Sequence, residues 1–535
     1  MTRIISVPDV VGMLADRHEL AFLDVREIVP FGSGHPLLAA NLPLSRLELS
    51  IRKLVPRRTT RIVLTDGGGG HAALAAGRLA RLDYSDVAVL DGGAPAWAAA
   101  GQALFPEIEV PTKGFGAFAK RYGRPNFIKP DELDRALRSN EDWIVLDSRP
   151  RAEYRNGNIP GSIDAPGADV LRWFDDLVPD PSTKVVVNCM SATRGILGGL
   201  SLVAAGVPNE VRVLHHGTRG WLLNGFDLET NASRFPEPPS AAAIDRARER
   251  VARIAERAGI ARIDAETLAR WRGDPERTTY VFDVRTADEF AAGHLAGSSN
   301  APEGSIVMGP DRYFATLKAR IVLVDDDSVR ATVTALWLAQ MGWGEVAVLL
   351  GGLESGCFQT GPEPASDIAP GVALPRAAEI TPRDLAALRA DLPVRVIDVG
   401  ISDAYLAGHL PDAVWCARGA LGDLLRDRPP DGPQDQPTVL TSETGTLAQL
   451  AADDLGAPAG LSVLAGGNAA WRGAGFELST DAGELASARD DHWLAASERP
   501  GEVRRNVIDY LEWEVTLLDD IEQGGMVPYR NLLWR

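Results

Sequence analysis

One short pattern occurs four times along the chain, and it limits the folds that the chain can adopt. Each copy starts with an apolar run that ends in aspartate and continues into a stretch with a late glycine: AFLDVREIVPFGSGH, IVLDSRPRAEYRNGN, YVFDVRTADEFAAGH and RVIDVGISDAYLAGH. The residue eleven positions after each aspartate is, in chain order, His35, Asn158, His294 and His409. A pattern that recurs at one spacing indicates a repeated structural unit.

Two further apolar runs follow in every copy. The second runs are RIVLTD, KVVVNC, RIVLVD and TVLTS, and the third runs lead into VLDGGAPAW, VLHHGTRGW, VLLGGLESG and VLAGGNAAW. Short apolar runs that alternate with helix-like stretches predict parallel strands covered by helices on both faces. We therefore expect an α/β protein of four tandem domains, each a parallel sheet flanked by helices. In open sheets of this kind the site lies beyond the carboxyl ends of the strands.

The repeats set the expected domain boundaries. We predict four domains and a C-terminal helical tail, at residues 1–110, 125–236, 258–362, 378–482 and 483–535. The tail contains NVIDYLEWEVTLLDDIEQ, whose apolar residues Ile508, Leu511, Val515 and Leu518 have the spacing of an amphipathic helix. We expect this helix to pack on the domains or on a second copy of the chain. The sequence leaves open whether the chain forms a homo-oligomer.

Charge and cysteine content exclude several classes of function. The net charge of −18 argues against nucleic acid and an anionic membrane surface as partners, because both need a basic face. Three cysteines, Cys189, Cys357 and Cys416, do not form a disulfide framework. The first residues carry charges throughout, unlike a signal peptide, and no run has the length of a membrane helix. We expect a cytoplasmic protein with neither a cofactor nor a metal.

Cys189 stands out because it ends the second apolar run of copy two and leads directly into a helix-like stretch. This position places the sulfur at a helix N-terminus, where backbone N–H groups and the helix dipole favour an anion. Such a position, with Arg194 five residues later, predicts a lowered thiol pKa and a nucleophilic thiolate. The N–H groups of the intervening loop could point inward at the group that the sulfur carries. The alternative is a buried structural cysteine at a strand end.

The block LDSRPRAEYRNGNIPGS and the closing glycine–tryptophan block resemble the two signature blocks of rhodanese-type sulfurtransferases. The resemblance covers nearly the whole chain as four tandem rhodanese domains, of which only the second carries the cysteine. It implies that Cys189 takes a sulfane sulfur from a donor such as thiosulfate and passes it from a persulfide to cyanide or a thiol. The partners would then be a small sulfur donor and one of these acceptors.

The resemblance also implies roles for the residues around Cys189. Arg194 would pair with the charge of the donor or persulfide, and the loop and one arginine outside it would bind substrate: Met190, Ser191, Ala192, Thr193 and Arg172. Asp147 and Arg149 would brace the loop from beneath. Relatives usually carry glycine and a second arginine where Ser191 and Ala192 stand, which puts the preference for an anionic donor in doubt.

The remaining positions suggest little chemistry. Copies one, three and four carry Asp66, Asp325 and Ser442 in place of the cysteine, so we expect them to be inactive scaffolds or docking domains. For Cys357 and Cys416 we expect a packing role. Either histidine of the pair His215–His216 could reach the crevice as an acid or base, although a surface position is more common.

Three other functions remain open from the sequence. A phosphatase or arsenate reductase of the same fold would need one more residue between Cys189 and the arginine than CMSATR provides. A sulfur carrier or persulfide sensor would use the same cysteine with a protein partner and without turnover. A purely structural array would need an inert Cys189.

Overall fold

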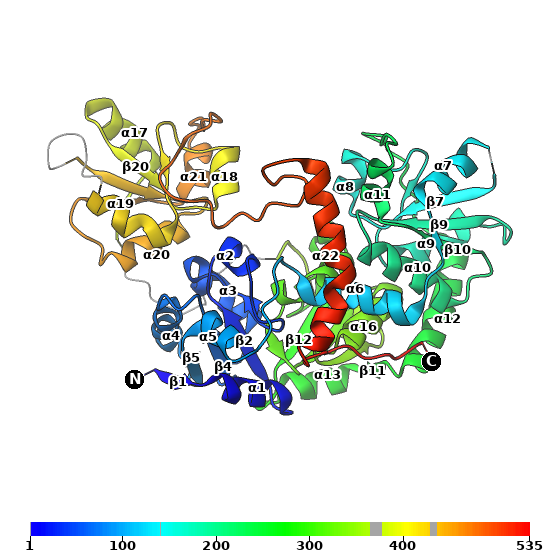
Figure 1. Cartoon of the computed structure of the whole chain (residues 1–535). Coiled ribbons are helices and arrows are strands. Elements are labelled where there is room, and N and C mark those ends of the chain that lie inside the picture. The colour runs from blue at the N-terminus through cyan, green and yellow to red at the C-terminus, as the bar shows by residue number, and fades with distance from the viewer. Residues whose placement is uncertain (1, 140, 364–376, 428–435, 535) are drawn as a thin grey trace.

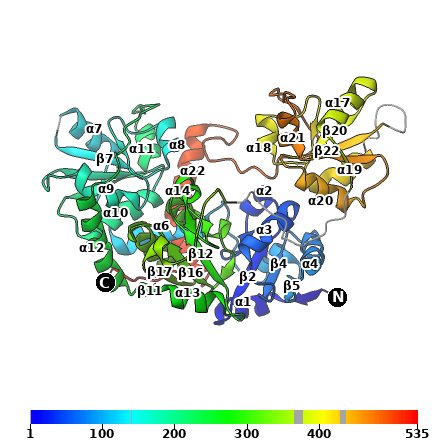
Figure 2. The same cartoon turned by 180° about the vertical axis from the view of Figure 1, so that it is seen from behind.

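The structure is a computed structural model that describes residues 2–139, 141–363, 377–427 and 436–534. The predicted connection between copies three and four lies largely outside these residues. Each copy forms its own sheet. Figure 1 shows the fourth copy above the first and the second copy on the other side of the molecule, with the third between them below. Figure 2 shows the same arrangement from behind.

The sheet of copy two carries Cys189 and is parallel throughout, in the order β6-β10-β9-β7-β8. Alternate residues of β9 enter different clusters, because Val185 and Val187 join the large core on one face while Val186 packs with Trp221 on the other. Both faces are therefore buried, as the sequence predicts. Its elements are β6 (Phe127–Ile128), α7 (Pro130–Arg138), β7 (Trp143–Asp147), α8 (Arg151–Asn156), β8 (Ile163–Asp164), α9 (Asp169–Leu177), β9 (Lys184–Asn188), α10 (Thr193–Ala205), β10 (Val211–Leu214) and α11 (Gly217–Leu223).

The other three copies repeat this strand order, which confirms the predicted fold class. Copy one has β1 (Arg3–Ile5), α1 (Val7–Ala15), β2 (Leu20–Asp24), α2 (Ile28–Gly32), β3 (Ala40–Asn41), α3 (Leu47–Leu54), β4 (Ile62–Thr65), α4 (His71–Arg81), β5 (Val87–Leu90) and α5 (Gly93–Ala99). Copy three has β11 (Ala261–Ile263), α13 (Ala265–Arg272), β12 (Thr279–Asp283), α14 (Ala287–Ala292), β14 (Ser299–Asn300), α15 (Glu303–Met308), β16 (Arg320–Val324), α16 (Val329–Met341) and β17 (Glu345–Leu349). Copy four has β19 (Ala378–Ile380), α17 (Pro382–Asp391), β20 (Arg395–Asp398), α18 (Ser402–Ala407), β21 (Val414–Trp415), α19 (Leu421–Asp427), β22 (Thr438–Thr441), α20 (Thr446–Asp454), β23 (Leu461–Leu464), α21 (Gly467–Gly473) and β24 (Glu484–Leu485).

Copies one and three share a sheet edge that the repeats do not predict. A short strand of copy three, β15 (Thr316–Leu317), pairs antiparallel with β2 of copy one. Next to it, the buried Tyr280 hydroxyl donates a hydrogen bond of 2.5 Å to the Leu54 carbonyl oxygen of copy one. The two copies therefore form one joined unit.

The histidine or asparagine eleven residues after each aspartate has a structural role. Nδ1 of His35, His294 and His409 lies 2.9–3.1 Å from the carbonyl oxygen four residues earlier. The Asn158 side-chain N–H donates to the Tyr154 carbonyl oxygen at 3.1 Å, the same bond. This position in copy two therefore differs in residue type but not in function.

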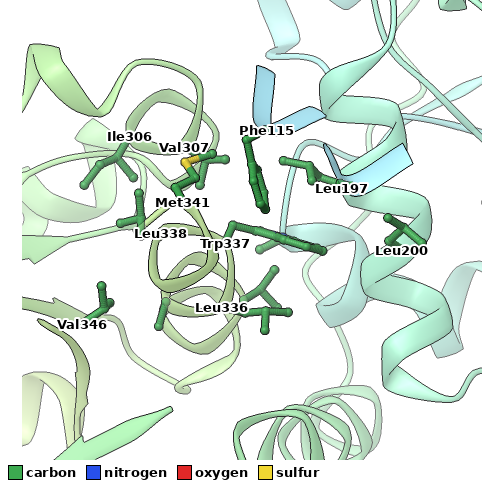
Figure 3. Close-up of a cluster of buried hydrophobic side chains, with 14 of the residues drawn as sticks. Phe115, Leu197, Leu200, Ile306, Val307, Leu336, Trp337, Leu338, Met341 and Val346 are labelled. Carbon is green, nitrogen blue, oxygen red and sulfur yellow. The ribbon is translucent and has the colours of Figure 1, made fainter. Parts of the chain in front are cut away.

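Copies two and three share a hydrophobic core around the helix that follows copy one, α6 (Val110–Gly123). In Figure 3, Phe115 of α6 and Trp337 of α16 lie between the side chains of α10, represented by Leu197 and Leu200, and those of copy three. The Phe115 and Trp337 ring centroids are 6.1 Å apart. A further helix, α12 (Ala241–Ala258), connects the two copies and joins this core.

The tail forms the predicted amphipathic helix, α22 (Val503–Gln523), which lies across α6 at the centre of Figure 1. It packs on the domains of its own chain, one of the two predicted outcomes. The predicted apolar face is only partly right. Leu511 and Leu518 are buried, but Val515 is 58% exposed. The buried face of α22 instead includes Tyr510, Leu517 and Ile521. No described helix is both long and apolar enough to cross a membrane.

Candidate active site

The loop after β9 holds Cys189 beneath the N-terminus of α10. The cysteine is only 3% exposed. The backbone N–H groups of Ser191 and Gly195 act on its sulfur to favour the thiolate. A Cβ on Gly195 would lie 3.3 Å from the sulfur, so the glycine allows the helix to begin this close to it. The loop therefore curls around the sulfur, as expected, although Gly195 was not among the residues predicted to face it.

The predicted lowering of the Cys189 pKa is wrong. Burial raises the pKa of this thiol above its ordinary value. The Arg194 guanidinium and the two backbone N–H groups act in the opposite direction but do not outweigh burial. The sequence identifies the groups that favour a thiolate but not the depth at which the sulfur lies.

Asp147 and Arg149 lie beneath the loop, where they hold strand ends together. The fully buried Arg149 donates to both Asp147 carboxylate oxygens, at 2.9 and 2.8 Å, and to the Gly157 carbonyl oxygen at 2.6 Å. Asn188, which immediately precedes the cysteine, donates to Asp147 at 3.1 Å. Copies one and three repeat the same arginine–aspartate pair without a cysteine. The pair therefore acts as a brace of the fold in each of these copies.

The start of α11 fixes the carbonyl side of the loop. The Thr218 backbone N–H and hydroxyl both donate to the Cys189 carbonyl oxygen at 2.8 Å. The Arg219 backbone N–H donates to the Met190 carbonyl oxygen at 3.0 Å. Gly217 makes this approach possible, since its φ is +54° and a Cβ there would lie 2.2 Å from the Cys189 carbonyl oxygen.

Gly217→Ala is therefore expected to displace the cysteine loop. The left-handed backbone alone costs about 1–2 kcal/mol for a residue with a side chain, and the contact with backbone adds to it. Gly225→Ala is the matched control, because Gly225 has a φ of +82° and open space around its Cβ. Thermal unfolding should show a larger loss of stability for Gly217→Ala than for Gly225→Ala. Equal losses in both variants would contradict the contact.

Copies one and three place a carboxyl group where copy two has the sulfur. In copy one, the Asp66 carboxylate accepts from the backbone N–H groups of Gly68 at 2.7 Å and Ala72 at 2.9 Å. In copy three, the Asp325 carboxylate accepts from Ser328 and Ala331 at 2.7 and 3.0 Å. The donors in copy one stand two and six residues after the aspartate, the same offsets as Ser191 and Gly195 after Cys189. The loops of copies one and three therefore direct backbone N–H groups at a carboxyl oxygen, although burial raises the pKa of Asp325 to about 7.

Cys189 opens into a cavity of about 280 Å³. Of the predicted substrate-binding residues, Met190, Ser191 and Thr193 line it, together with Arg194. The Arg194 guanidinium also makes a two-point ion pair with Glu153, at 2.7 and 2.9 Å. The cysteine, the arginine and most of the loop therefore meet in one place.

Ala192 and Arg172 do not join them. Ala192 lines a separate cavity of about 330 Å³ with His215 and His216, so neither histidine lines the Cys189 cavity. Burial lowers the pKa of His216 to about 4. Arg172 lies in a cavity of about 760 Å³ between copies two and three, where Asp169 and Asp327 hold it at 3.0 and 2.7 Å. Arg194 lines this cavity too but Cys189 does not, so the contact of Arg172 with the donor stays a prediction.

The two other cysteines differ from each other. Cys416 is buried, as expected for a packing role, and burial raises its pKa to about 11. The packing role predicted for Cys357 is wrong, because this residue is exposed. It follows the last strand of the copy three core, in a region where that copy has no tryptophan.

The rest of the cavity is lined by residues that the sequence analysis did not place in the site. These residues lie before and on α6, at the start of α11, and in the tail: Glu107, Lys113, Arg219, Trp493, Tyr510 and Glu514. A comparison of the copies could have identified Arg219, since the matching positions of the inactive copies carry no basic residue: Pro95, Glu354 and Ala469. Lys113 and the tail residues lie outside the repeats, so comparing the copies could not find them.

Comparison with known proteins agrees with this geometry. A family model for the rhodanese-like domain matches residues 6–100, 129–224, 264–357 and 381–474. A crystal structure of a thiosulfate sulfurtransferase from Pseudomonas aeruginosa is 40% identical, with a TM-score of 0.93 and coverage of 99% of both chains.

Two curated proteins match shorter stretches. A thiosulfate sulfurtransferase of Pseudomonas aeruginosa is 27% identical over 198 residues, which are 33% of this chain and 72% of that protein. The HTH-type transcriptional regulator Rv0324 of Mycobacterium tuberculosis is 30% identical over 106 residues, 19% of this chain and 46% of that protein. With four matched domains and a full-length structural relative, the chain belongs to the rhodanese-like family and is a tandem four-domain sulfurtransferase.

Proposed function

We propose that this enzyme moves a sulfane sulfur from thiosulfate to cyanide or a thiol through a persulfide on Cys189. The Cys189 thiol first gives up its proton to water, and the thiolate then attacks the outer sulfur of thiosulfate. A new S–S bond forms, and sulfite leaves with the electron pair of the broken bond. The acceptor then attacks the terminal sulfur, and the Cys189 thiolate is released. Cyanide becomes thiocyanate, and a thiolate becomes a persulfide.

One observation carries this proposal: Asp66 and Asp325 occupy the position of Cys189 in the loops of copies one and three. A carboxylate oxygen stands two bonds beyond Cβ, and so does the terminal sulfur of a cysteine persulfide. In both copies these oxygens accept backbone N–H groups of the loop. The loop of copy two has N–H donors at the same offsets as copy one. This favours a persulfide anion held by the loop of Cys189.

The size of the cavity supports small reactants. About 280 Å³ is at the lower end of ligand sites, and the tail residues Trp493 and Tyr510 cover it. Thiosulfate, cyanide and small thiols have the size for such a space. A sulfur carrier would instead need its protein partner to reach a cysteine that is 3% exposed.

Intact-mass measurement after brief exposure to thiosulfate tests the proposal. We expect the protein to gain one sulfur atom, to lose it on addition of cyanide, and to repeat this cycle with release of thiocyanate. Loading without repeated release, until a protein partner is added, would favour the carrier. No gain of sulfur from thiosulfate would overturn the thiosulfate reaction.

A further inference from the structure

Two cations of the Cys189 cavity lie outside the cysteine loop. Lys113 comes from α6 and is 8% exposed, and Arg219 comes from the start of α11. Tyr510 of the tail lies against both, since the centre of its ring is 5.2 Å from the Lys113 Nζ and 4.5 Å from the Arg219 guanidinium. The Lys113 Nζ also lies 5.5 Å from the Trp513 ring.

Neither cation forms an ion pair with a described residue. The carboxylates around the cavity are mostly engaged elsewhere, because Glu107 pairs with Arg499 at 2.5 Å and Glu109 pairs with Arg312. Glu514 is the remaining buried acid, and burial raises its pKa above the ordinary value. The aromatic contacts and the nearby Glu107 and Glu514 carboxylates compensate only part of the cost of burying a charged lysine, since the Lys113 pKa is still lowered. A bound anion would supply the missing charge.

We propose that Lys113 and Arg219 bind the oxyanion end of the sulfur donor, while its sulfane end faces Cys189. This inference rests on the proposed function and names the residues that select an anionic donor. For thiosulfate, the two side chains hold the SO₃ group as the S–S bond breaks. The electron pair of that bond leaves on sulfite, whose negative charge the two cations stabilise. The subsite exists only when α6 and the tail pack against copy two.

This subsite accounts for the departure in the loop. The relatives that the sequence resembles carry a second arginine in the loop, where this chain has Ser191 and Ala192. Here positive charge comes instead from α6 and α11, which line the same cavity as the loop. An anionic donor is therefore still expected, despite the missing loop arginine.

The test measures the two half-reactions separately in Lys113→Met and Arg219→Gln. We expect the thiosulfate concentration that half-saturates loading to rise about tenfold or more in each variant, the usual effect of losing a charged hydrogen-bond donor. Discharge of a preloaded persulfide by cyanide should stay within about twofold of the wild type, because no sulfite is bound in that step. Lys113→Arg, which keeps the charge, should recover part of the affinity.

Lys120→Met is the matched control. Lys120 lies seven residues further along α6, is exposed, and lines the neighbouring cavity rather than that of Cys189. It should load like the wild type. If the wild type loads sulfur and the Lys113 and Arg219 variants load equally well, the subsite is wrong while the proposed function stands. If loading and discharge slow by the same factor, the residues support the fold rather than the donor. A wild type that never loads would remove the proposed function itself.

The pH dependence gives an independent readout. Burial lowers the pKa of Lys113 to about 8, with Glu107 and Glu514 raising it and Arg219 and Arg499 lowering it further. The neighbouring Tyr510 hydroxyl stays protonated in this range, because burial raises its pKa. Lys113 is therefore charged below pH 8 and neutral above it. The half-saturating thiosulfate concentration should rise as the pH passes through about 8, and this rise should be absent in Lys113→Met.

Discussion

Replacing Cys189 with serine is expected to abolish persulfide formation and leave the fold intact. A serine oxygen cannot take up a sulfane sulfur as a stable persulfide, so loading should fall below detection. The fold should tolerate the change, because copy four already has a serine in this place. The Ser442 hydroxyl there accepts the Ala448 N–H at 3.3 Å, and Ala448 stands six residues after Ser442 as Gly195 does after Cys189.

The measurement is intact mass after thiosulfate, with thermal unfolding beside it. Exposed Cys357 could take up sulfur without any site, so the cleanest background is Cys357→Ser. In that background the protein with Cys189 should gain one sulfur, and Cys189→Ser should gain none. Cys416 is buried and lacks a basic loop, and it serves as an internal negative control. A sulfur that persists on Cys189→Ser would place the chemistry on another residue.

The parts of the fold that repeat in the sequence could be predicted from it. Each sheet is built from short apolar runs and turns that lie close together in the chain, and each predicted run forms a strand. The strand β15 could not be predicted, because it completes the sheet of another copy across an interface. The buried face of α22 could not either. Val515 fits the apolar spacing, yet it faces solvent, since α6 determines which side of the helix is covered.

The candidate site, like the fold, could be predicted from the sequence only in part. Cys189, Arg194 and the loop follow each other in the sequence, and the fold brings them together because a strand leads directly into a helix there. Lys113 and Tyr510 are almost 400 residues apart, and only the packing of α22 on α6 brings them to one wall. The pKa of Cys189 had the wrong predicted sign for a related reason. Its burial comes from the packing of the loop within the fold, which the loop sequence alone does not give.

Arg194 is the residue whose replacement should slow the reaction most while leaving the nucleophile in place. Its guanidinium lines the Cys189 cavity and acts on the thiol to lower its pKa, against the effect of burial. In Arg194→Gln this charge is lost, and Glu153, now without its partner, repels an anionic donor. We expect loading by thiosulfate to slow by about 10²- to 10³-fold, as when one donor of an oxyanion site is removed. Rapid-mixing measurement of persulfide formation would give this rate.

Copy three contains the control for this experiment. Arg330 makes the same two-point pair with Glu289, at 2.9 and 3.0 Å, in a loop without cysteine. Arg330→Gln should lower the stability of the protein, since Arg330 is almost fully buried, but it should load sulfur at nearly the wild-type rate. Arg194→Lys should fall between the wild type and Arg194→Gln, because it keeps the charge and loses the two-point geometry. If Arg330→Gln slows loading as much as Arg194→Gln does, the effect of Arg194 comes from stability and not from the charge beside Cys189.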